Sequence, residues 1–455
     1  MQSFRNVLDA IGKTPLMEVS QLDTGPCRLF LKLENQNPTG SIKDRIGLSL
    51  IEAAEREGKI KPGGTLIEAT AGNTGLGLAL VAAQKGYKLI LVIPDKMAQE
   101  KILHLRALGA DTRITRSDVN KGHPDYYQDV AERLTREIPN SFYVNQFANP
   151  ANPAAHESTT GPEIWAQMEQ MMDAMVVGVG SGGTLTGLSR YFGRVAPHVE
   201  MVLADPLGSI LAGLVKNGQE QEAGSWLVEG IGEDFVPPNC ELKHVRHAYE
   251  VSDRESFLCA RELLAKEGIL GGSSTGTLLA AALRYCREQT QPKRVVTLVC
   301  DSGNKYLTKI YNDHWMFQQG LLDRTQRGNL VDLIVRRYQE GSTVTVEPAE
   351  SLMQAYRRMT LFDVSQLPVM EGRKLIGILD ESDLLMHVQQ DPARFDNTVS
   401  EAMVRNVETL PADASMDALL AVFQRDHVAV VQDGDSFVGL ITRIDLLNYL
   451  RQQLG

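Results

Sequence analysis

Short, uninterrupted runs of branched apolar residues recur through the first 315 residues of this chain and alternate with stretches of helical pattern. The clearest runs cover residues 88–93, 175–179, 200–204 and 294–300. A strand without polar alternation is buried on both faces, which is typical of parallel sheets covered by helices. The pattern therefore predicts an α/β fold with doubly wound, largely parallel sheets. Ligands of such sheets bind at the carboxyl ends of the strands, where glycine-rich loops lead into helices.

The bulk properties exclude several classes of protein. A chain of 455 residues with a net charge of −11 is long enough for two or three domains and lacks the basic balance that nucleic-acid binding needs. Its five cysteines form no Cys-x-x-Cys pair, and His123 and His156 lack metal-ligand spacing, so we expect neither disulfides nor a metal. With no signal-like N-terminus and no membrane-length apolar run, we expect a cytoplasmic protein.

The character of the sequence changes after Trp315. Residues 318–340 are charged and polar and suit a partly helical linker. An internal repeat follows, because residues 348–355 resemble 411–418 and residues 377–384 resemble 439–446. One such unit buries too little surface to be stable alone, so two are expected to pair. We predict a first domain over 1–317, a linker over 318–340 and a paired module, of α+β class, over 341–455.

One lysine stands at the start of a predicted helix. Lys43 ends the run Thr-Gly-Ser-Ile-Lys and precedes a helix whose buried face includes Ile46, Leu50 and Ile51. The positive end of the helix dipole disfavours an ammonium at this point. A neutral, nucleophilic amine, as in a Schiff base, is consistent with the position. On this local argument alone, a solvated lysine is the commoner alternative.

Two glycine-rich loops could bind anions. Residues 70–75, Thr-Ala-Gly-Asn-Thr-Gly, follow an apolar stretch and open a helix, although an ordinary strand-to-helix turn would have the same composition. Residues 178–184, Gly-Val-Gly-Ser-Gly-Gly-Thr, fit the dinucleotide pattern Gly-x-Gly-x-x-Gly, with Asp205 at the end of the next strand. A single phosphate would be held equally well by the second loop. A nicotinamide dehydrogenase and a single-phosphate cofactor both remain possible at this point.

Residues 37–45, Asn-Pro-Thr-Gly-Ser-Ile-Lys-Asp-Arg, closely resemble the cofactor-lysine segment of the cysteine and cystathionine synthases. These are pyridoxal-phosphate enzymes of the tryptophan-synthase-β type. Residues 11–16, Ile-Gly-Lys-Thr-Pro-Leu, resemble the opening segment of the same family, and the resemblance covers nearly the whole chain. It implies that Lys43 forms the Schiff base with the cofactor and acts as the catalytic base. A dehydrogenase would give Lys43 and Asn73 no role.

The resemblance also implies the residues of the site. Asn73 would bind the 3′ oxygen of the cofactor, and Ser273 would meet its pyridine nitrogen, although Ser274 is only one residue away in register. A hydroxyl at that nitrogen favours β-elimination. The implied cofactor-binding residues are Lys43, Asn73, Gly180, Ser181, Gly182, Gly183, Thr184 and Ser273. The implied substrate-binding residues are Thr70, Ala71, Gly72, Thr74, Gln146, Phe147, Gly230 and Glu233.

Three of these positions depart from the family pattern. The family often has serine in place of Ala71, and cystathionine synthases often have tyrosine in place of Phe147. Many relatives also have tyrosine where this chain has Glu233. We hypothesise that Glu233 binds the amino group of the second substrate; a solvated loop carboxylate is the alternative.

The repeat of the C-terminal region resembles a CBS-domain pair, the Bateman module that binds adenosyl ligands in many proteins. Thr442 and Asp445 fit the nucleotide-binding pattern of that module, in which the aspartate holds the ribose. In the first repeat Asp380 takes the place of the threonine and would repel a phosphate. At most one good site is therefore expected, for S-adenosylmethionine or an adenine nucleotide. A purely structural module, or one that serves assembly, is the alternative.

The implied reaction is the replacement of the hydroxyl group of L-serine by L-homocysteine to give L-cystathionine, with hydrogen sulfide release from cysteine as a side activity. A cysteine synthase acting on O-acetylserine would share every cofactor residue, and a non-catalytic adenosyl-ligand sensor is a distant alternative. The family implies a homodimer or a higher homo-oligomer. Because the family signature begins at Ile11, we expect no haem-binding extension of the kind that some animal members carry.

Overall fold

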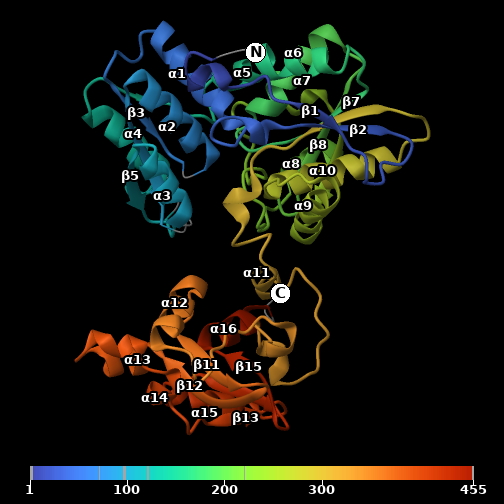
Figure 1. Ribbon diagram of the computed structural model, residues 1–455. Helices are drawn as coiled ribbons and strands as arrows, with labels where there is room; N and C mark the ends of the chain where they lie inside the picture. Colours follow the sequence, from blue (N-terminus) through green and yellow to red (C-terminus); the bar gives the residue numbers. More distant parts are fainter. Residues whose placement is uncertain (1–3, 71, 96–98, 120–121, 220, 453–455) are drawn as a thin grey trace. The chain divides into compact units, whose positions relative to one another are not determined.

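The computed structural model describes residues 4–70, 72–95, 99–119, 122–219 and 221–452. The chain forms two compact units, Met1–Tyr311 and Asn312–Gly455, which are coloured blue to yellow and orange to red in Figure 1. Helix α11 (Asp313–Gln318) belongs to the second unit, whereas the sequence placed the end of the first domain at residue 317. No described helix is both long and apolar enough to cross a membrane.

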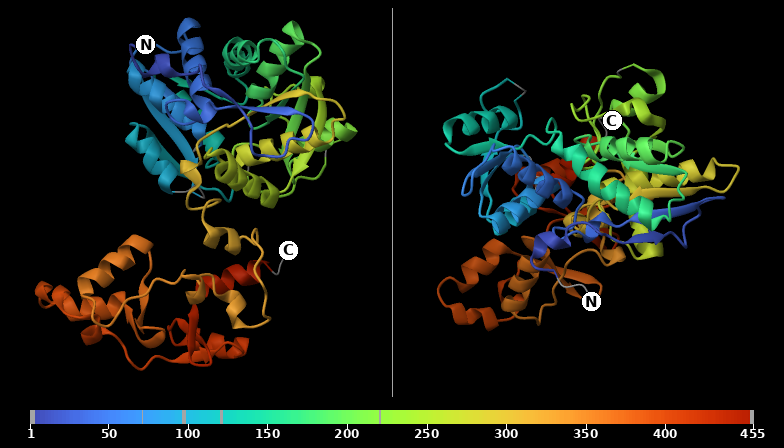
Figure 2. Two further views of the ribbon diagram at one scale, coloured as in Figure 1. Left: turned by 45° about the vertical axis from the view of Figure 1, so that its right-hand side comes forward. Right: turned by 90° about the horizontal axis from the view of Figure 1, so that it is seen from above.

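The first unit contains two sheets, which occupy different halves of the unit (Figures 1 and 2). One has the strand order β1-β2-β10-β7-β8-β9 and the other β5-β4-β3-β6, and every pairing is parallel except β1 with β2. The predicted doubly wound α/β class is confirmed, and the four apolar runs are β4, β7, β8 and β10. The strands are β1 Leu16–Glu18, β2 Arg28–Lys32, β3 Thr65–Glu68, β4 Lys88–Pro94, β5 Asp111–Thr115, β6 Ser141–Tyr143, β7 Ala174–Gly178, β8 Glu200–Pro206, β9 Val245–Val251 and β10 Arg294–Leu298.

Helices cover both faces of the four-stranded sheet. Leu66 of β3 and Leu91 of β4 pack into one core with α1 (Lys43–Arg56) and α2 (Asn73–Lys85). Ile67, the next residue of β3, packs into a second core with α4 (Tyr127–Glu137). Successive side chains of a strand point to opposite faces, so continuous apolar runs are needed here. The remaining helices of this unit are α3 Gln99–Ala107, α5 Ala151–Ala155, α6 Gly161–Gln167, α7 Gly183–Val195, α8 Leu211–Asn217, α9 Asp253–Glu267 and α10 Ser273–Arg287, with the short 3-10 helices η1 Val7–Ala10, η2 Glu34–Gln36, η4 Leu242–His244 and η5 Gly303–Tyr306 and the π-helical segment η3 His156–Thr160.

A buried ion cluster fixes the start of α1. The guanidinium of Arg45 donates to both carboxylate oxygens of Glu34, at 2.7 and 2.8 Å, and to both of Glu163, at 2.9 and 2.7 Å. Lys32 donates to Glu163 at 2.9 Å. These four residues, the Arg45 cluster, join α1 to β2, η2 and α6. Because Lys43 lies two residues before Arg45, the cluster also fixes where Lys43 stands.

The opening segment of the chain docks on this cluster. Thr14 donates to Glu34 at 2.7 Å, and the backbone N–H of Gly12 donates to Asn37 at 2.8 Å. Gly12 has a φ of +81°, and a Cβ at this position would lie 2.8 Å from the Arg45 guanidinium. Only glycine tolerates both constraints. The two segments that carry the family resemblance, residues 11–16 and 37–45, therefore pack against each other.

The second unit repeats one arrangement twice. Each repeat has a short parallel pairing, an antiparallel hairpin and two helices, and the hairpins are β11–β12 and β14–β15. Each repeat also buries its own apolar cluster. The predicted linker contains the 3-10 helices η6 and η7. The elements are η6 Leu330–Leu333, η7 Tyr338–Glu340, α12 Leu352–Phe362, β11 Gln366–Glu371, β12 Lys374–Asp380, α13 Glu381–Val388, η8 Pro392–Asp396, α14 Val399–Ala402, β13 Thr409–Pro411, α15 Met416–Gln424, β14 Ala429–Asp433, β15 Ser436–Ile441 and α16 Arg443–Gln452.

The Arg45 cluster can be tested by removing its central cation. Arg45→Met should lower the free energy of unfolding by about 3–5 kcal/mol, because it leaves buried carboxylates without a partner. Arg28→Met is the matched control: Arg28 pairs with Glu18 at 2.6 Å, but both side chains are exposed. An exposed pair contributes roughly 0–1 kcal/mol. Urea unfolding of the full chain would measure both, and equal losses would contradict the assigned role.

Candidate active site

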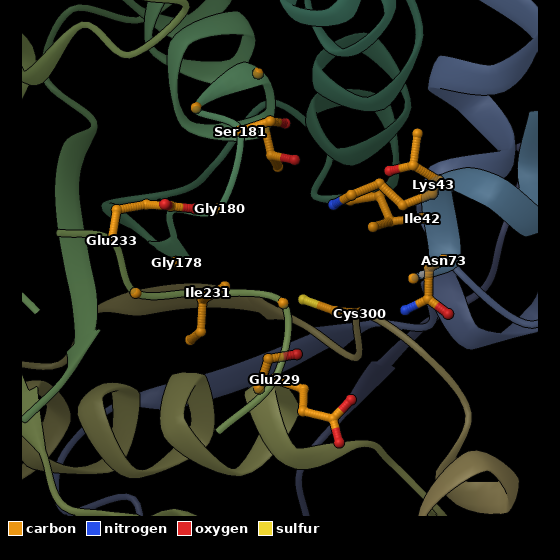
Figure 3. Close-up of a pocket in the computed structure, with 18 of the residues that line it drawn as sticks. Ile42, Lys43, Asn73, Gly178, Gly180, Ser181, Glu229, Ile231, Glu233 and Cys300 are labelled. Carbon is orange, nitrogen blue, oxygen red and sulfur yellow. The ribbon is translucent and has the colours of Figure 1, made fainter. Parts of the chain in front are cut away.

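A cavity of about 290 Å³ collects segments that are distant in the sequence. It lies at the carboxyl ends of β3, β7 and β10, as expected for parallel sheets. Figure 3 shows Lys43 and Asn73 on one side and Gly180, Ser181 and Glu233 on the other. The predicted site residues that line it are Lys43, Thr70, Gly72, Asn73, Thr74, Gln146, Phe147, Gly180, Ser181, Gly182, Gly183, Thr184, Gly230 and Glu233. Ala71 lies outside the described residues.

Lys43 is the first residue of α1, and its amine points toward the centre of the cavity (Figure 3). Burial lowers the pKa of this amine, and the opposing effects of Cys300 and Asp301 are smaller. The amine is therefore more readily neutral than that of a surface lysine. A neutral amine is a nucleophile and a base, which is the chemistry that the sequence predicted for this residue.

The glycine-rich loop after β7 forms an anion cradle. Gly182 has a φ of +83°, which favours glycine. A Cβ on Gly180 would lie 2.5 Å from the carbonyl oxygen of Gly230, and one on Gly183 would lie 1.9 Å from Asn152 Oδ1. The glycines thus allow close packing of backbone and leave free N–H groups at the start of the 13-residue helix α7. Such N–H groups, together with the helix dipole, bind a phosphate.

Residues behind the cradle hold its shape. Asn152 donates from Nδ2 to Ser181 Oγ at 2.9 Å and to the carbonyl oxygen of Gln146 at 2.8 Å. The hydroxyl of Thr184 contacts His156 Nε2 at 3.2 Å. Burial lowers the pKa of His156 well below its ordinary value, with smaller contributions from Lys43 and Arg45, so this imidazole is neutral. The sequence predicts no role for His156, because its spacing fits no metal site and no local pattern links it to Thr184.

The Asn73 amide is held from two sides. Its Nδ2 donates to Asp301 Oδ2 at 2.8 Å, and Lys305 Nζ donates to its Oδ1 at 2.6 Å. Next to it, Thr74 donates to Gln146 Oε1 at 2.6 Å, which joins the loop at 70–75 to the predicted carboxylate-binding segment. The structure therefore brings these two predicted segments together.

The two adjacent serines of α10 have different surroundings. Ser273 is 1% exposed, and its hydroxyl accepts the backbone N–H of Glu229 at 3.0 Å, so it lies behind the cavity wall. Of these two serines, Ser274 lines the cavity. The role at the pyridine nitrogen, which was predicted for Ser273, therefore fits Ser274 better, and we propose that assignment.

Several lining residues were not predicted from the sequence. Trp226 and Glu229 belong to the loop before Gly230. Cys300 lies two residues after the end of β10. Cys300 could have been found, because a residue at the carboxyl end of a parallel strand points to the ligand edge. Burial raises the pKa of its thiol to about 12, although Lys43 opposes the shift, so the thiol is not an anionic nucleophile. No comparable pattern marks Trp226.

A second cavity of about 510 Å³, here called the antechamber, adjoins the first. The two share the wall residues Gly72, Asn73, Glu229 and Gly230. Lys101, His104 and Lys305 also line the antechamber. Lys101 and Lys309 both pair with the carboxylate of Glu229. The antechamber therefore shares a wall with the lysine-bearing cavity, and ion pairs hold the Glu229 side chain of that wall.

In the second unit, Thr442 and Asp445 bond to each other. Thr442 donates to Asp445 Oδ2 from its backbone N–H at 2.8 Å and from its hydroxyl at 2.6 Å, at the start of α16. Asp380 and Asp383 form the equivalent cap of α13. Asp445 also lines a cavity of about 210 Å³ within this unit.

The residues of the main cavity fit a pyridoxal phosphate. They supply a buried amine, an amide donor and a glycine cradle for one phosphate. Its volume is close to the lower end of small-molecule sites, roughly 300–1,000 Å³. The dinucleotide alternative gives Lys43 and Asn73 no role. Asp205, its supposed ribose ligand, accepts the backbone N–H of Ala212 at 2.8 Å instead.

Comparison with known proteins agrees with this chemistry. Residues 7–301 match the family described as pyridoxal-phosphate dependent enzyme, and residues 335–390 and 399–452 each match the CBS domain. The chain therefore belongs to the pyridoxal-phosphate dependent enzyme family and carries a C-terminal CBS pair. The predicted resemblance and class of enzyme are confirmed.

Named relatives place the chain further within that family. It is 38% identical to a cystathionine beta-synthase of Dictyostelium discoideum, covering 98% of this chain and 92% of that protein. It is 39% identical to cysteine synthase A of Escherichia coli over 66% of this chain and 92% of that protein. A crystal structure of a hydrogen sulfide-producing enzyme from Fusobacterium nucleatum, 35% identical, matches with a TM-score of 0.62 over 67% of this chain and 98% of that one.

Two glycines of α7 allow a controlled test of the cradle. Gly183→Ala should weaken pyridoxal phosphate binding at least about tenfold, because the new Cβ would displace Asn152 and with it the Ser181 hydroxyl. Gly193→Ala on the same helix adds a Cβ that meets nothing within 4 Å and should leave the affinity unchanged. Fluorescence titration of the apoprotein would measure both dissociation constants. Equal affinities would show that the cradle does not bind the cofactor.

Proposed function

We propose that the protein is a cystathionine β-synthase, which replaces the hydroxyl group of L-serine with the thiol of L-homocysteine to give L-cystathionine. The convergence of Lys43, Asn73 and the glycine cradle on one cavity carries the proposal. The near full-length similarity to proteins named cystathionine beta-synthase supports the choice of substrates.

When bound, pyridoxal phosphate supplies an electron sink for the bond to the α-hydrogen of the substrate. The side chain of Lys43 acts at that hydrogen. Its amine accepts the α-proton of L-serine and returns a proton to the same carbon after the thiol has added. This proton transfer needs a neutral amine, which burial of Lys43 favours. Ser274, which would hold the pyridine nitrogen of the cofactor, is uncharged and would not protonate the ring.

The carboxylate of L-serine has a defined place in this scheme. Thr70, Gly72 and Thr74 line the cavity at the start of α2, where the first N–H groups of a helix lack intrahelical partners and can bind an anion. Gln146, bonded to Thr74, adds an amide. The carboxylate bound there would hold the α-hydrogen toward Lys43. Ala71 would contribute only its backbone.

Two related activities use the same residues. The similarity to cysteine synthase A favours O-acetylserine and sulfide as alternative substrates. The similarity to a hydrogen sulfide-producing enzyme favours sulfide release from cysteine. A non-catalytic sensor is disfavoured, because it would have no use for a buried lysine in a complete cofactor site.

A spectroscopic assay separates these alternatives. With L-serine the visible band of the bound cofactor should change, L-homocysteine should restore it, and mass spectrometry should detect L-cystathionine. O-acetylserine with sulfide is the comparison. If only that pair changes the spectrum and forms cysteine, the protein is a cysteine synthase. If no cofactor binds, the whole proposal fails.

Glu233 gives the proposal a pH signature. Burial raises the pKa of its carboxyl to about 8, with Asp234 and Asp205 adding repulsion. The group is thus mostly neutral at pH 7 and ionised above pH 8. If it binds the ammonium of L-homocysteine, ionisation strengthens that contact. The ratio of the KM for L-homocysteine in Glu233→Gln to that in the wild type should be near one at pH 7. Above pH 8 this ratio should rise to about three to ten.

The neighbouring acid provides the control for this measurement. Asp234→Asn removes a like charge and should lower the pKa of Glu233, so the same rise should begin at a lower pH. A KM for L-homocysteine that is the same in wild type and Glu233→Gln at every pH would contradict the role. Glu233 would then be an ordinary loop carboxylate.

The other parts of the chain complete the proposal. We infer that residues 341–455 form a regulatory module in which Thr442 and Asp445 bind an adenosyl ligand such as S-adenosylmethionine, and that the linker spans 318–340. A cytoplasmic homodimer or higher homo-oligomer without haem remains the prediction from the sequence. Thr442 and Asp445 are hydrogen-bonded to each other. An adenosyl ligand that binds these two polar groups would have to break this bond, and the cost of breaking it should weaken the binding of the ligand.

A further inference from the structure

The contacts of Asn73 extend to a lysine that the proposed reaction does not use. We propose that Lys305 is a positioning residue: its ammonium fixes the orientation of the Asn73 amide and so presents an N–H donor, rather than a carbonyl, to the ring oxygen of the cofactor. The inference rests on the pyridoxal phosphate site and concerns how this chain holds its cofactor, whichever amino acids react.

The geometry allows only one orientation of the amide. Lys305 Nζ lies 2.6 Å from Asn73 Oδ1, and Asp301 Oδ2 lies 2.8 Å from Asn73 Nδ2. The flipped amide would place an NH₂ group against an ammonium and a carbonyl oxygen against a carboxylate. Each contact would then be repulsive, because an ammonium only donates and a carboxylate only accepts. The two charged residues therefore set the direction of the side chain together.

The opposite partner is itself held in place. Asp301 is 1% exposed, and the Oδ2 that accepts from Asn73 also accepts the hydroxyl of Tyr306 at 2.9 Å. Lys305 and Tyr306 are adjacent in η5. The same 3-10 turn thus contacts Asn73 directly through Lys305. It also acts on Asn73 indirectly, because Tyr306 holds Asp301. Asn73 would otherwise rotate freely, since a terminal amide torsion has broad minima.

One donor remains free after these contacts. The amide has two N–H groups and one oxygen. Lys305 occupies the oxygen, and Asp301 takes one N–H. Figure 3 shows the nitrogen of Asn73 on the side facing the cavity and its oxygen turned away. The remaining N–H can therefore bind an oxygen in the cavity, and a donor at that point stabilises an oxyanion more than a neutral hydroxyl.

The position of Lys305 also explains why a cation is present there. It lines the antechamber together with Lys101, but its ammonium donates to Asn73 and, at 3.5 Å, to the carbonyl oxygen of Gly40, whereas Lys101 pairs with Glu229. Gly40 precedes the lysine-bearing helix by three residues. One ammonium thus links the loop before Lys43 to Asn73.

The test compares Lys305→Met with Lys305→Arg. Loss of the ammonium should weaken pyridoxal phosphate binding to the apoprotein about tenfold or more, as expected for a charge-assisted hydrogen bond. It should also move the absorption of the bound cofactor from the visible toward the near ultraviolet, because the ring oxygen loses its oriented donor. Arginine should restore most of both. Fluorescence titration, to which Trp226 in the cavity wall contributes, and absorbance measure the two effects.

Two controls separate positioning from other effects. Lys101 is a cation of the same wall that pairs with Glu229 and does not contact Asn73. Lys101→Met should therefore leave the spectrum of the bound cofactor unchanged. In an Asn73→Ala background, Lys305→Met should have little further effect on affinity, since the two residues act as one unit. Equal losses with and without Asn73, or an unchanged spectrum in Lys305→Met, would overturn the inference. Absence of any cofactor binding in wild type would instead overturn the proposed function.

Discussion

The buried contacts of Arg45 are the constraint on which the catalytic unit depends. Four hydrogen bonds from one guanidinium are shared between two carboxylates, and Glu34 is 0% exposed. Such a cluster contributes little net stability compared with an apolar core, but it permits few alternative arrangements. Here it joins the opening segment, strand β2 of the six-stranded sheet and the helix that begins with Lys43. The position of the reactive amine is therefore set by buried charges that cannot be separated without a loss of stability.

The rest of the site depends on how closely backbone segments approach each other. The glycine cradle meets the loop at Gly230 and the side chain of Asn152 at distances that exclude a Cβ. Charged side chains then fix the polar groups that the cradle does not supply. Asn73 is oriented by Lys305 and Asp301, just as Lys43 is positioned by the Arg45 cluster. In both cases residues remote in sequence determine the direction of a group that faces the cofactor.

In both units a helix start can be interpreted either as a ligand site or as ordinary local structure. In the CBS pair, Thr442 and Asp445 cap α16, and Asp380 and Asp383 cap α13, so the nucleotide-binding pattern is also a helix start. A capped helix end is stable without a ligand. The pattern alone therefore cannot distinguish a binding site from a structural cap. In the first unit the corresponding ambiguity, a glycine loop for one phosphate or two, was resolved by the lysine and asparagine that share its cavity.

The sequence by itself determined the features that depend on local conformation and composition. Continuous apolar runs specify strands buried on both faces, and the glycines near residues 72 and 182 specify the loops that lead into helices. Each of these requirements involves residues that are close together in the sequence, so the sequence alone is enough to predict the strands and the loops. The tertiary structure alone decided which of two adjacent serines faces the cavity, because successive helix residues point about 100° apart and packing of α10 sets the rotation. It also decided the pairing of Asn73 with Lys305, which are 232 residues apart. No local pattern encodes such a contact, since it exists only after β10 has inserted between β2 and β7.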